Sequence, residues 1–490
     1  MSDTLQRGVR GASVTLGGQG ALLLIQLAGT IALSRLLSPD DFGLFALVLV
    51  FMAFGELLRD MGMPAAALQA KSLSHQQASN IFWVSAALST AAGVALVVAT
   101  PLLVGIYDEP RLSLVAPTMA LVLLVSGLQA QYQVRLARAM RFTDIVIANV
   151  VARLAGLCIG IVGAVAGLSY WALVLQAVGS AVLSLLLLLF MARWLPSRPR
   201  RNSGSRELLR AGGHLGGAQL LGYAADNVDT LVIGWHFGPS VLGFYNRAFQ
   251  LFMAPLNTAF NPLVRVIVPT VNRAVEEGKR ASQILLRVQL GLCGLVIWVL
   301  LVTATTAPWL VPALLGEQWS NVVTLLQILA IGGAFRALSQ TNYWTYLVEN
   351  QSKELLLSNA ISKPLQIVLV FGAAFVSVEA VAWAYAIGRA LTWPFNLVWM
   401  LRISRDYSWQ FGLNGARLLL AAGGSFAASS WVLDQSALTA LAAIGLGTLL
   451  STVIFGLLLV LAPGGRRELA GVASIAQALR TRATSPVVEP

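Results

Sequence analysis

Five ionisable side chains lie well inside long apolar stretches of this sequence, where charge is costly. They are Arg153, Asp226, Asp229, Arg336 and Arg389. An ionised group at the centre of a membrane-spanning helix costs roughly 2.5–3.5 kcal/mol on insertion scales, so such groups usually face a wet cavity or a charged partner. Arginine presents a planar fork of donors that matches phosphate oxygens, and it keeps its charge when buried. The three arginines are therefore candidate ligands for an anionic group such as a lipid diphosphate.

Four polar residues, two of them the aspartates just named, are candidates for the lining of the same cavity. Asp226 and Asp229 are three residues apart and share one helical face. Gln26 matches Asp226 when the chain is shifted by 200 residues. Glu56 shares its helical face with two other charged residues, and an ion pair within that helix is the alternative for it. We expect all four to line a cavity or to take part in ion coupling. The alternative is that these side chains form buried contacts between helices.

The elements that must position these residues are membrane-spanning helices. Of 490 residues, 57% are hydrophobic and 11% are charged, against about 25% charged in soluble domains. About fourteen apolar runs of roughly 20 residues follow one another along the chain, each long enough to cross about 30 Å of hydrocarbon as a helix. We predict an all-α polytopic membrane protein.

Basic residues are concentrated in alternate connections between these runs. Arg135, Arg138 and Arg141 stand in one connection and the sequence RPRR in a later one, whereas the intervening connections read SPDD, YDEP and FGPS. The positive-inside rule then places both termini in the cytoplasm. The net charge of +12 is thus a topology signal, and no nucleic-acid partner is expected.

Two stretches of the chain repeat at a long spacing. Pro39 and Gly43 in SRLLSPDDFGLFAL match Pro239 and Gly243 in GWHFGPSVLGFYNRAF at a shift of 200 residues, and ANVVARLAG matches SNAISKPLQ at a shift of 210. Each copy contains an even number of runs, so the two copies run parallel, as two six-helix lobes around an axis along the membrane normal. We expect the Pro–Gly pairs to form equivalent tight external turns.

The duplication sets the expected domain boundaries. We predict a six-helix lobe over 1–192, a cytoplasmic linker over 193–210, a second six-helix lobe over 211–404, an additional transmembrane hairpin over 405–462 and a cytoplasmic tail over 463–490. The linker is assigned by its Pro, Ser and Arg content.

A family resemblance accompanies these motifs. DNVDTLVIGWHFGPSVLGFYNRAFQLFMAPLN, followed by VRVIVPTVNRA, resembles the start of the second lobe in Wzx-type oligosaccharide flippases, and SRLLSPDDFGLFAL is similar to their first-lobe signature. These are bacterial polysaccharide transporters of the multidrug/oligosaccharidyl-lipid/polysaccharide superfamily. The resemblance covers nearly the whole chain, although Trp235 and His236 stand where relatives often carry Gly-Arg.

The resemblance implies a function and a set of partners. It implies alternating-access transport of a polyprenyl-diphosphate-linked oligosaccharide from the inner to the outer leaflet of the bacterial cytoplasmic membrane, for surface polysaccharide biosynthesis. The expected partners are this lipid-linked oligosaccharide, membrane lipids, and polysaccharide polymerase and export proteins.

Two other functions remain open from the residues. A cation-coupled drug or metabolite antiporter of the same superfamily would share the two lobes, but would normally lack the added hairpin and favour acidic cavity groups. A structural or assembly protein of the membrane is the third reading. An enzyme is not expected, because His75, His214 and His236 are dispersed and no nucleophile–base, metal-ligand or GxxxxGK[ST] pattern occurs. No cofactor or metal is expected.

Overall fold

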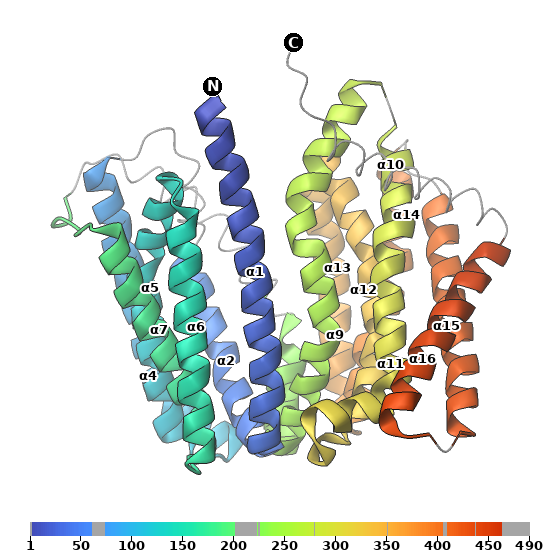
Figure 1. The fold of residues 1–490 in the computed structure, drawn as a ribbon, viewed down its shortest axis with the longest axis horizontal. Coiled ribbons are helices and arrows are strands. Elements are labelled where there is room, and N and C mark those ends of the chain that lie inside the picture. The colour runs from blue at the N-terminus through green and yellow to red at the C-terminus, as the bar shows by residue number, and fades with distance from the viewer. Residues whose placement is uncertain are drawn as a thin grey trace. The chain divides into compact units, whose positions relative to one another are not determined.

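The computed structural model describes residues 2–60, 74–200, 223, 226–278, 280–349, 351–404, 409–436 and 438–462. Within these residues the chain is helical and contains no strand (Figure 1). Contacts between residues divide the chain into two units, Met1–Gly243 (unit 1) and Phe244–Pro490 (unit 2).

Unit 1 is a bundle of long helices followed by the beginning of α9. The helices are α1 (Ser2–Leu36), α2 (Pro39–Asp60), α4 (His75–Tyr107), α5 (Leu112–Arg138), α6 (Phe142–Val165) and α7 (Trp171–Ala192). α1 packs on α6, α6 on α7, and α4 and α7 both on α5. Buried aliphatic side chains of α2, α4 and α5, among them Leu44, Leu96 and Leu123, form its main core.

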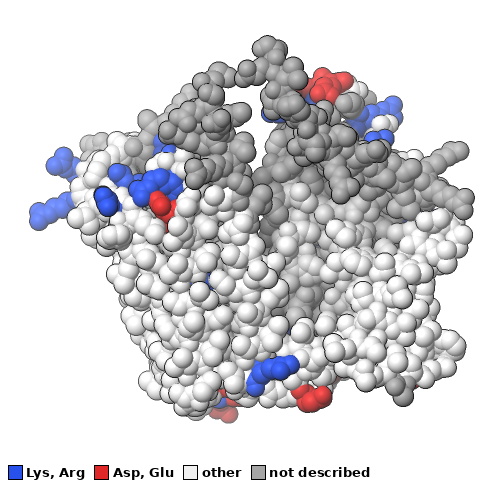
Figure 2. All heavy atoms as spheres, in the orientation of Figure 1, with Lys and Arg blue, Asp and Glu red and all other residues white. Residues whose placement is uncertain are grey.

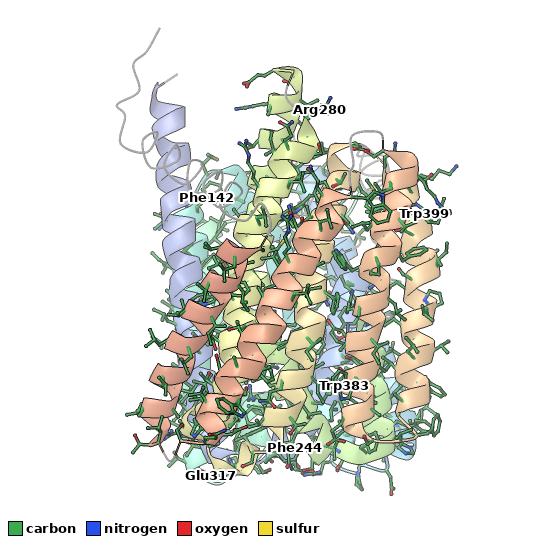
Figure 3. The ribbon with its side chains drawn as sticks, turned by 90° about the vertical axis from the view of Figure 1, so that its right-hand side faces the viewer. Phe142, Phe244, Arg280, Glu317, Trp383 and Trp399 are labelled. Atoms are coloured by element: carbon green, nitrogen blue, oxygen red, sulfur yellow. The ribbon has the colours of Figure 1, made fainter. Side chains whose placement is uncertain are left out.

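Unit 2 contains most of α9 and all the later helices. The elements are α9 (Val228–Glu276), α10 (Ala281–Val288), a π-helical turn (Gln289–Cys293), α11 (Gly294–Leu315), a 3-10 turn (Glu317–Trp319), α12 (Val322–Val348), α13 (Ser352–Ala373), α14 (Val378–Ile403), α15 (Gln410–Asp434) and α16 (Ala440–Leu461). The hairpin of α15 and α16 packs on α11. Arg280 and Trp399 lie near one end of this unit, and Phe244 and Glu317 near the other (Figure 3).

The predicted fold class is confirmed. Eleven helices of the described residues are long and apolar enough to cross a membrane, and α14 and the two parts of the bent α9 accompany them. On the face shown in Figure 2, the charged side chains gather near the two ends and almost none lie between them. That distribution is the one expected of spans that cross hydrocarbon. The lobe boundaries stay a prediction, because the contact boundary falls at Gly243 and much of 193–210 lies outside the described residues.

The start of α2 is determined by its own sequence. Ser38 and Asp41 form a reciprocal cap: the Ser38 amide donates to Asp41 Oδ2 at 2.9 Å, and the Asp41 amide donates to Ser38 Oγ at 3.2 Å. Pro39 takes the first helical position, where its missing N–H costs nothing. The Ser169 hydroxyl also donates to Asp41, which ties this turn to the turn before α7.

The two Pro–Gly turns meet each other within unit 1. Pro39 begins α2, and Pro239 follows the kink of α9 at Gly238, whose φ is +80°. A Cβ atom added to Gly43 would overlap the carbonyl oxygen of Pro239, and a Cβ atom added to Gly243 would overlap the carbonyl oxygen of Pro39. Only glycine allows this approach of backbone to backbone. The contact is reciprocal, which is the pattern that a parallel repeat predicts.

Arg111 joins the turn between α4 and α5 to the start of α2. Its guanidinium contacts Asp40 Oδ2 at 2.5 Å and Glu109 Oε2 at 2.6 Å, and its Nε donates to Glu109 Oε1 at 2.7 Å. The guanidinium carbon also lies 5.7 Å from the centre of the Tyr170 ring. Hydrogen bonds from Arg111 lower the pKa of Glu109, and the bond to Glu109 is the largest cause that raises the pKa of Arg111.

Arg111→Gln is expected to lower the unfolding temperature of the detergent-solubilised protein by a few degrees, for a loss on the order of 1–2 kcal/mol. Glu109 is 7% exposed and would lose its cation. Because the folded pKa of Glu109 is lowered, its contribution is present above the unfolded pKa of about 4.3 and disappears as the pH falls through the folded pKa. The difference between wild type and variant should therefore stay constant from about pH 7 to about pH 5 and shrink as the pH falls below about 4.

Arg141→Gln is the matched control for this experiment. Arg141 pairs with Asp144 at 2.5 Å, but its side chain is 48% exposed, and exposed pairs contribute little. Equal unfolding temperatures for Arg111→Gln and Arg141→Gln would contradict a stabilising role of Arg111.

The first part of the predicted linker is held against α4; we call residues 194–200 the linker strap. Trp194 is 5% exposed, and its Nε1 donates to His75 Nε2 at 3.2 Å. Asn80 bonds the backbone of Arg200 twice: its Nδ2 donates to the Arg200 carbonyl at 2.8 Å, and its Oδ1 accepts from the Arg200 amide at 3.1 Å. The strap is thus fixed at both of its ends.

Candidate functional site

A polar pocket of about 560 Å³ lies among α1, α2, α5, α6 and α7; we call it the unit-1 pocket. Gln26 from α1, Glu56 from α2 and Arg153 from α6 all line it. The other polar side chains of its lining are Gln19, Ser126, Gln129, Asn149, Ser180 and Ser184. The structure therefore brings together three of the seven residues that the sequence singled out.

Small residues on α6 allow this arrangement. A Cβ atom on Gly156 would come within 2.7 Å of the Ser180 side chain and one on Gly160 within 2.9 Å of Gln176, so α7 approaches α6 closely. Close packing over small residues is a usual way for helices to associate in a membrane. Asn149 and Arg153 lie one helical turn apart and line the pocket from the same helix.

The side chain of Arg153 is available to a ligand. The residue is exposed, and its guanidinium makes no ion pair with the residues that the structure describes. Gln129 is engaged instead: its Nε2 donates to the Ala181 carbonyl at 3.1 Å, and its Oε1 accepts from the Ser184 hydroxyl at 3.4 Å. Gln129 thus helps to hold α5 against α7.

Arg336 and Arg389 meet at one tyrosine in unit 2. Arg336 Nη1 donates to the hydroxyl of Tyr385 at 3.2 Å, and the guanidinium carbon of Arg389 lies 5.2 Å from the centre of the same ring. Tyr385 is 2% exposed and packs edge-on against Phe249 and Phe252, with ring centres 5.7 and 5.8 Å away. We call Arg336, Tyr385 and Arg389 the Arg–Tyr cluster.

Sequence reasoning missed Tyr385. The signal was present, because Tyr385 and Arg389 are four residues apart and therefore share a helical face. A buried tyrosine beneath two half-buried arginines orients both guanidinium groups. Such an arrangement presents two cations to a multiply charged anion.

Asp226 and Asp229 are not among the residues that line either pocket described in the structure. Asp229 is 4% exposed, and its Oδ1 accepts a hydrogen bond from the Thr230 amide at 2.9 Å. Asp226 is half-buried. Their part in ion coupling stays a prediction.

An apolar pocket of about 550 Å³ lies among α11, α12, α14 and α15 in unit 2. Phe335 and Trp383 contribute to its walls, and Trp383 is 45% exposed. Trp383 is labelled in Figure 3. The polar group of Gln327 in its lining is satisfied, because Nε2 donates to the Ala304 carbonyl at 3.1 Å. The sequence carried no sign of this pocket, whose lining suits hydrocarbon.

The described residues contain no preformed metal site. Among the residues that the structure describes, no group of three His, Cys, Asp or Glu is placed to hold a metal ion. Cys293 is buried and Cys158 is exposed, and both are free thiols.

Residues 32–324 match the family model described as a polysaccharide biosynthesis protein. The lipopolysaccharide biosynthesis protein WzxC of Escherichia coli K12 is 26% identical, over 67% of this chain and 66% of its own length. The teichuronic acid biosynthesis protein TuaB of Bacillus subtilis 168 is 25% identical, over 79% of this chain and 81% of its own. The matched part thus spans about two thirds of WzxC.

Two solved structures share the fold. The lipid II flippase MurJ in an inward closed conformation has a TM-score of 0.70 at 10% identity and covers 91% of this chain and 98% of its own. An inward-facing multidrug-resistance transporter of the MATE family has a TM-score of 0.59 at 14% identity. The match covers 79% of this chain and 95% of the transporter. Both are membrane transporters, and at these identities the likeness concerns the fold.

Proposed function

This chain belongs to the family of polysaccharide biosynthesis proteins, and on that premise we propose that it flips a polyprenyl-diphosphate-linked oligosaccharide across the bacterial cytoplasmic membrane. The substrate moves from the inner to the outer leaflet, where surface polysaccharide is assembled. The protein acts as a transporter by alternating access and carries out no covalent chemistry.

The observation that carries this proposal is the unit-1 pocket. A diphosphate–sugar headgroup cannot cross hydrocarbon cheaply, because each polar group that loses water without a new partner costs several kcal/mol. A pocket lined by Arg153, Glu56 and amide side chains replaces part of that hydration. Arg153, Arg336 and Arg389 contact the headgroup, while the prenyl tail stays in hydrocarbon.

The charged residues support a proposal for the orientation of the chain in the membrane and for the coupling of transport to a cation. The basic connections face the cytoplasm, so both termini are cytoplasmic. Asp226 and Asp229 either tune the arginines or bind a coupling cation, since one charge moved across 100 mV supplies about 2.3 kcal/mol. Polysaccharide polymerase and export proteins receive the product on the outer side.

Deletion of the gene tests the proposal. The lipid-linked oligosaccharide should accumulate on the cytoplasmic leaflet, and the intact gene should restore its appearance outside; mass analysis of the lipid then names the sugar. Normal leaflet distribution in the deletion strain, together with lost resistance to a cationic drug, would favour the antiporter instead.

Tyr385→Phe is expected to reduce export about three- to tenfold, because it removes one hydrogen bond to a charged group. The hydroxyl that accepts from Arg336 is lost, while the ring below Arg389 remains. Tyr385→Leu removes both contacts and should reduce export further. Tyr343→Phe, at a 38% exposed position on α12, is the control. Equal export in all three variants would show that Tyr385 does not position the arginines.

A further inference from the structure

The unit-1 pocket and the Arg–Tyr cluster differ in charge. The pocket lining contains one arginine, Arg153, and one carboxylate, Glu56, so its formal charges cancel. The cluster brings two guanidinium groups onto one tyrosine. Contacts between arginine and phosphate are strong because both partners are charged. The cluster is therefore matched to a diphosphate, and the pocket is matched to a ligand without net charge.

Carboxamides and hydroxyls make up the rest of the polar lining. Each carboxamide offers two N–H donors and one acceptor oxygen, and a sugar hydroxyl likewise donates one hydrogen bond and accepts others. We propose that the unit-1 pocket binds neutral glycosyl residues of the headgroup, whereas the Arg–Tyr cluster binds its diphosphate. This inference rests on the proposed function and divides the headgroup between two sites.

The groups that would meet the sugar are available. Gln26, Asn149 and Arg153 line the pocket and make no hydrogen bond through their side chains with other residues that the structure describes. Gln129 is already satisfied by Ala181 and Ser184, so it supports the wall. An open set of donors and acceptors inside a membrane-spanning bundle is costly unless a polar ligand or water fills it.

The shape of the polar lining suits a chain of rings. Gln19 and Gln26 are two helical turns apart on α1, about 10 Å along its axis, and Asn149 and Arg153 are one turn apart on α6. α1 packs on α6, so the polar groups run along both helices. The volume of about 560 Å³ lies within the range of about 300–1,000 Å³ for ligand sites.

Two probes separate the two sites in the purified, full-length protein in nanodiscs. One is the free oligosaccharide released by mild acid from the lipid-linked fraction of the host; the other is farnesyl diphosphate, which carries no sugar. Gln26→Ala combined with Asn149→Ala should raise the Kd for the oligosaccharide about tenfold or more and leave that for farnesyl diphosphate within about twofold. Arg336→Gln combined with Arg389→Gln should raise the Kd for farnesyl diphosphate about tenfold or more and leave the Kd for the oligosaccharide within about twofold.

Gln133→Ala is the matched control, because Gln133 is a half-buried carboxamide on α5 outside the pocket lining. Glu56→Gln gives an independent test. It leaves Arg153 as the one formal charge of the lining, so a pocket that held the diphosphate would bind farnesyl diphosphate more tightly. We expect its Kd to stay within about twofold of wild type, since this anion binds at the other site.

The outcomes are distinct. Weaker farnesyl diphosphate binding in the pocket variants, tighter binding in Glu56→Gln, or unchanged oligosaccharide binding in the folded double variant would each overturn the division of the headgroup. The proposed function would survive those results if the wild-type protein still moves the lipid-linked oligosaccharide between leaflets of a proteoliposome. If the wild type does not move it, the proposed function and this inference both fall.

Discussion

Replacing Arg336 and Arg389 together by Gln is expected to lower polysaccharide export about a hundredfold or more while the protein remains in the membrane at normal abundance. Gln is shorter than Arg but keeps a polar group that can form hydrogen bonds, and it removes the charge. Each charge-assisted contact contributes about 1.5–3 kcal/mol, so the loss of two is a large share of the binding energy for a diphosphate. Surface polysaccharide and membrane-bound protein should be measured in the same cells.

Arg287→Gln is the control for this pair, because Arg287 is exposed and lies on the short helix α10. Arg153→Gln should also reduce export, because Arg153 lines the unit-1 pocket. Wild-type export from the double variant and from Arg153→Gln, with the proteins folded, would mean that these arginines are contacts between helices and not part of the substrate site.

Gly43→Ala is expected to reduce export about tenfold or more, since overpacking of a tight contact costs about 1–3 kcal/mol. The added methyl group would overlap the backbone carbonyl of Pro239, and a backbone atom at the start of a helix cannot rotate away as a side chain can. Gly243→Ala should have the same effect by the reciprocal overlap with Pro39. The measurements are again the amount of surface polysaccharide and the amount of the protein in the membrane.

Gly105→Ala is the matched control, because a Cβ atom at this helical position in α4 meets nothing within 4 Å. Export at the wild-type level from Gly43→Ala would show that the two turns need not touch during transport. Loss of the protein from the membrane would instead assign the contact to folding.

Helix positions were predictable from the sequence because a span needs a long apolar run, whatever it packs against. The break before α2 was predictable too, since Ser38, Pro39 and Asp41 specify a helix start locally. The sequence predicted the break at FGPS less accurately. The sequence separates two runs there, whereas the structure keeps α9 helical on both sides of a single kink at Gly238.

The site could be predicted by residue type but not by grouping. A charge inside an apolar run is visible in the sequence, so Arg153, Arg336 and Arg389 were found. Whether such residues meet depends on which helices pack together, and that choice is not encoded in a hydropathy pattern. Hence Gln26, Glu56 and Arg153 share the unit-1 pocket, while Arg336 and Arg389 belong to another unit.

The linker strap takes the first part of the predicted linker out of free movement. Residues 193–200 could span about 26–29 Å if fully extended. The two hydrogen bonds between Asn80 and the Arg200 backbone, and the one that Trp194 donates to His75, hold this stretch on α4. The part of the predicted linker that α4 holds therefore extends to Arg200. A chain divided after residue 200 would keep the strap on its first fragment, whereas one divided after residue 192 would leave the side chains of His75 and Asn80 without these partners.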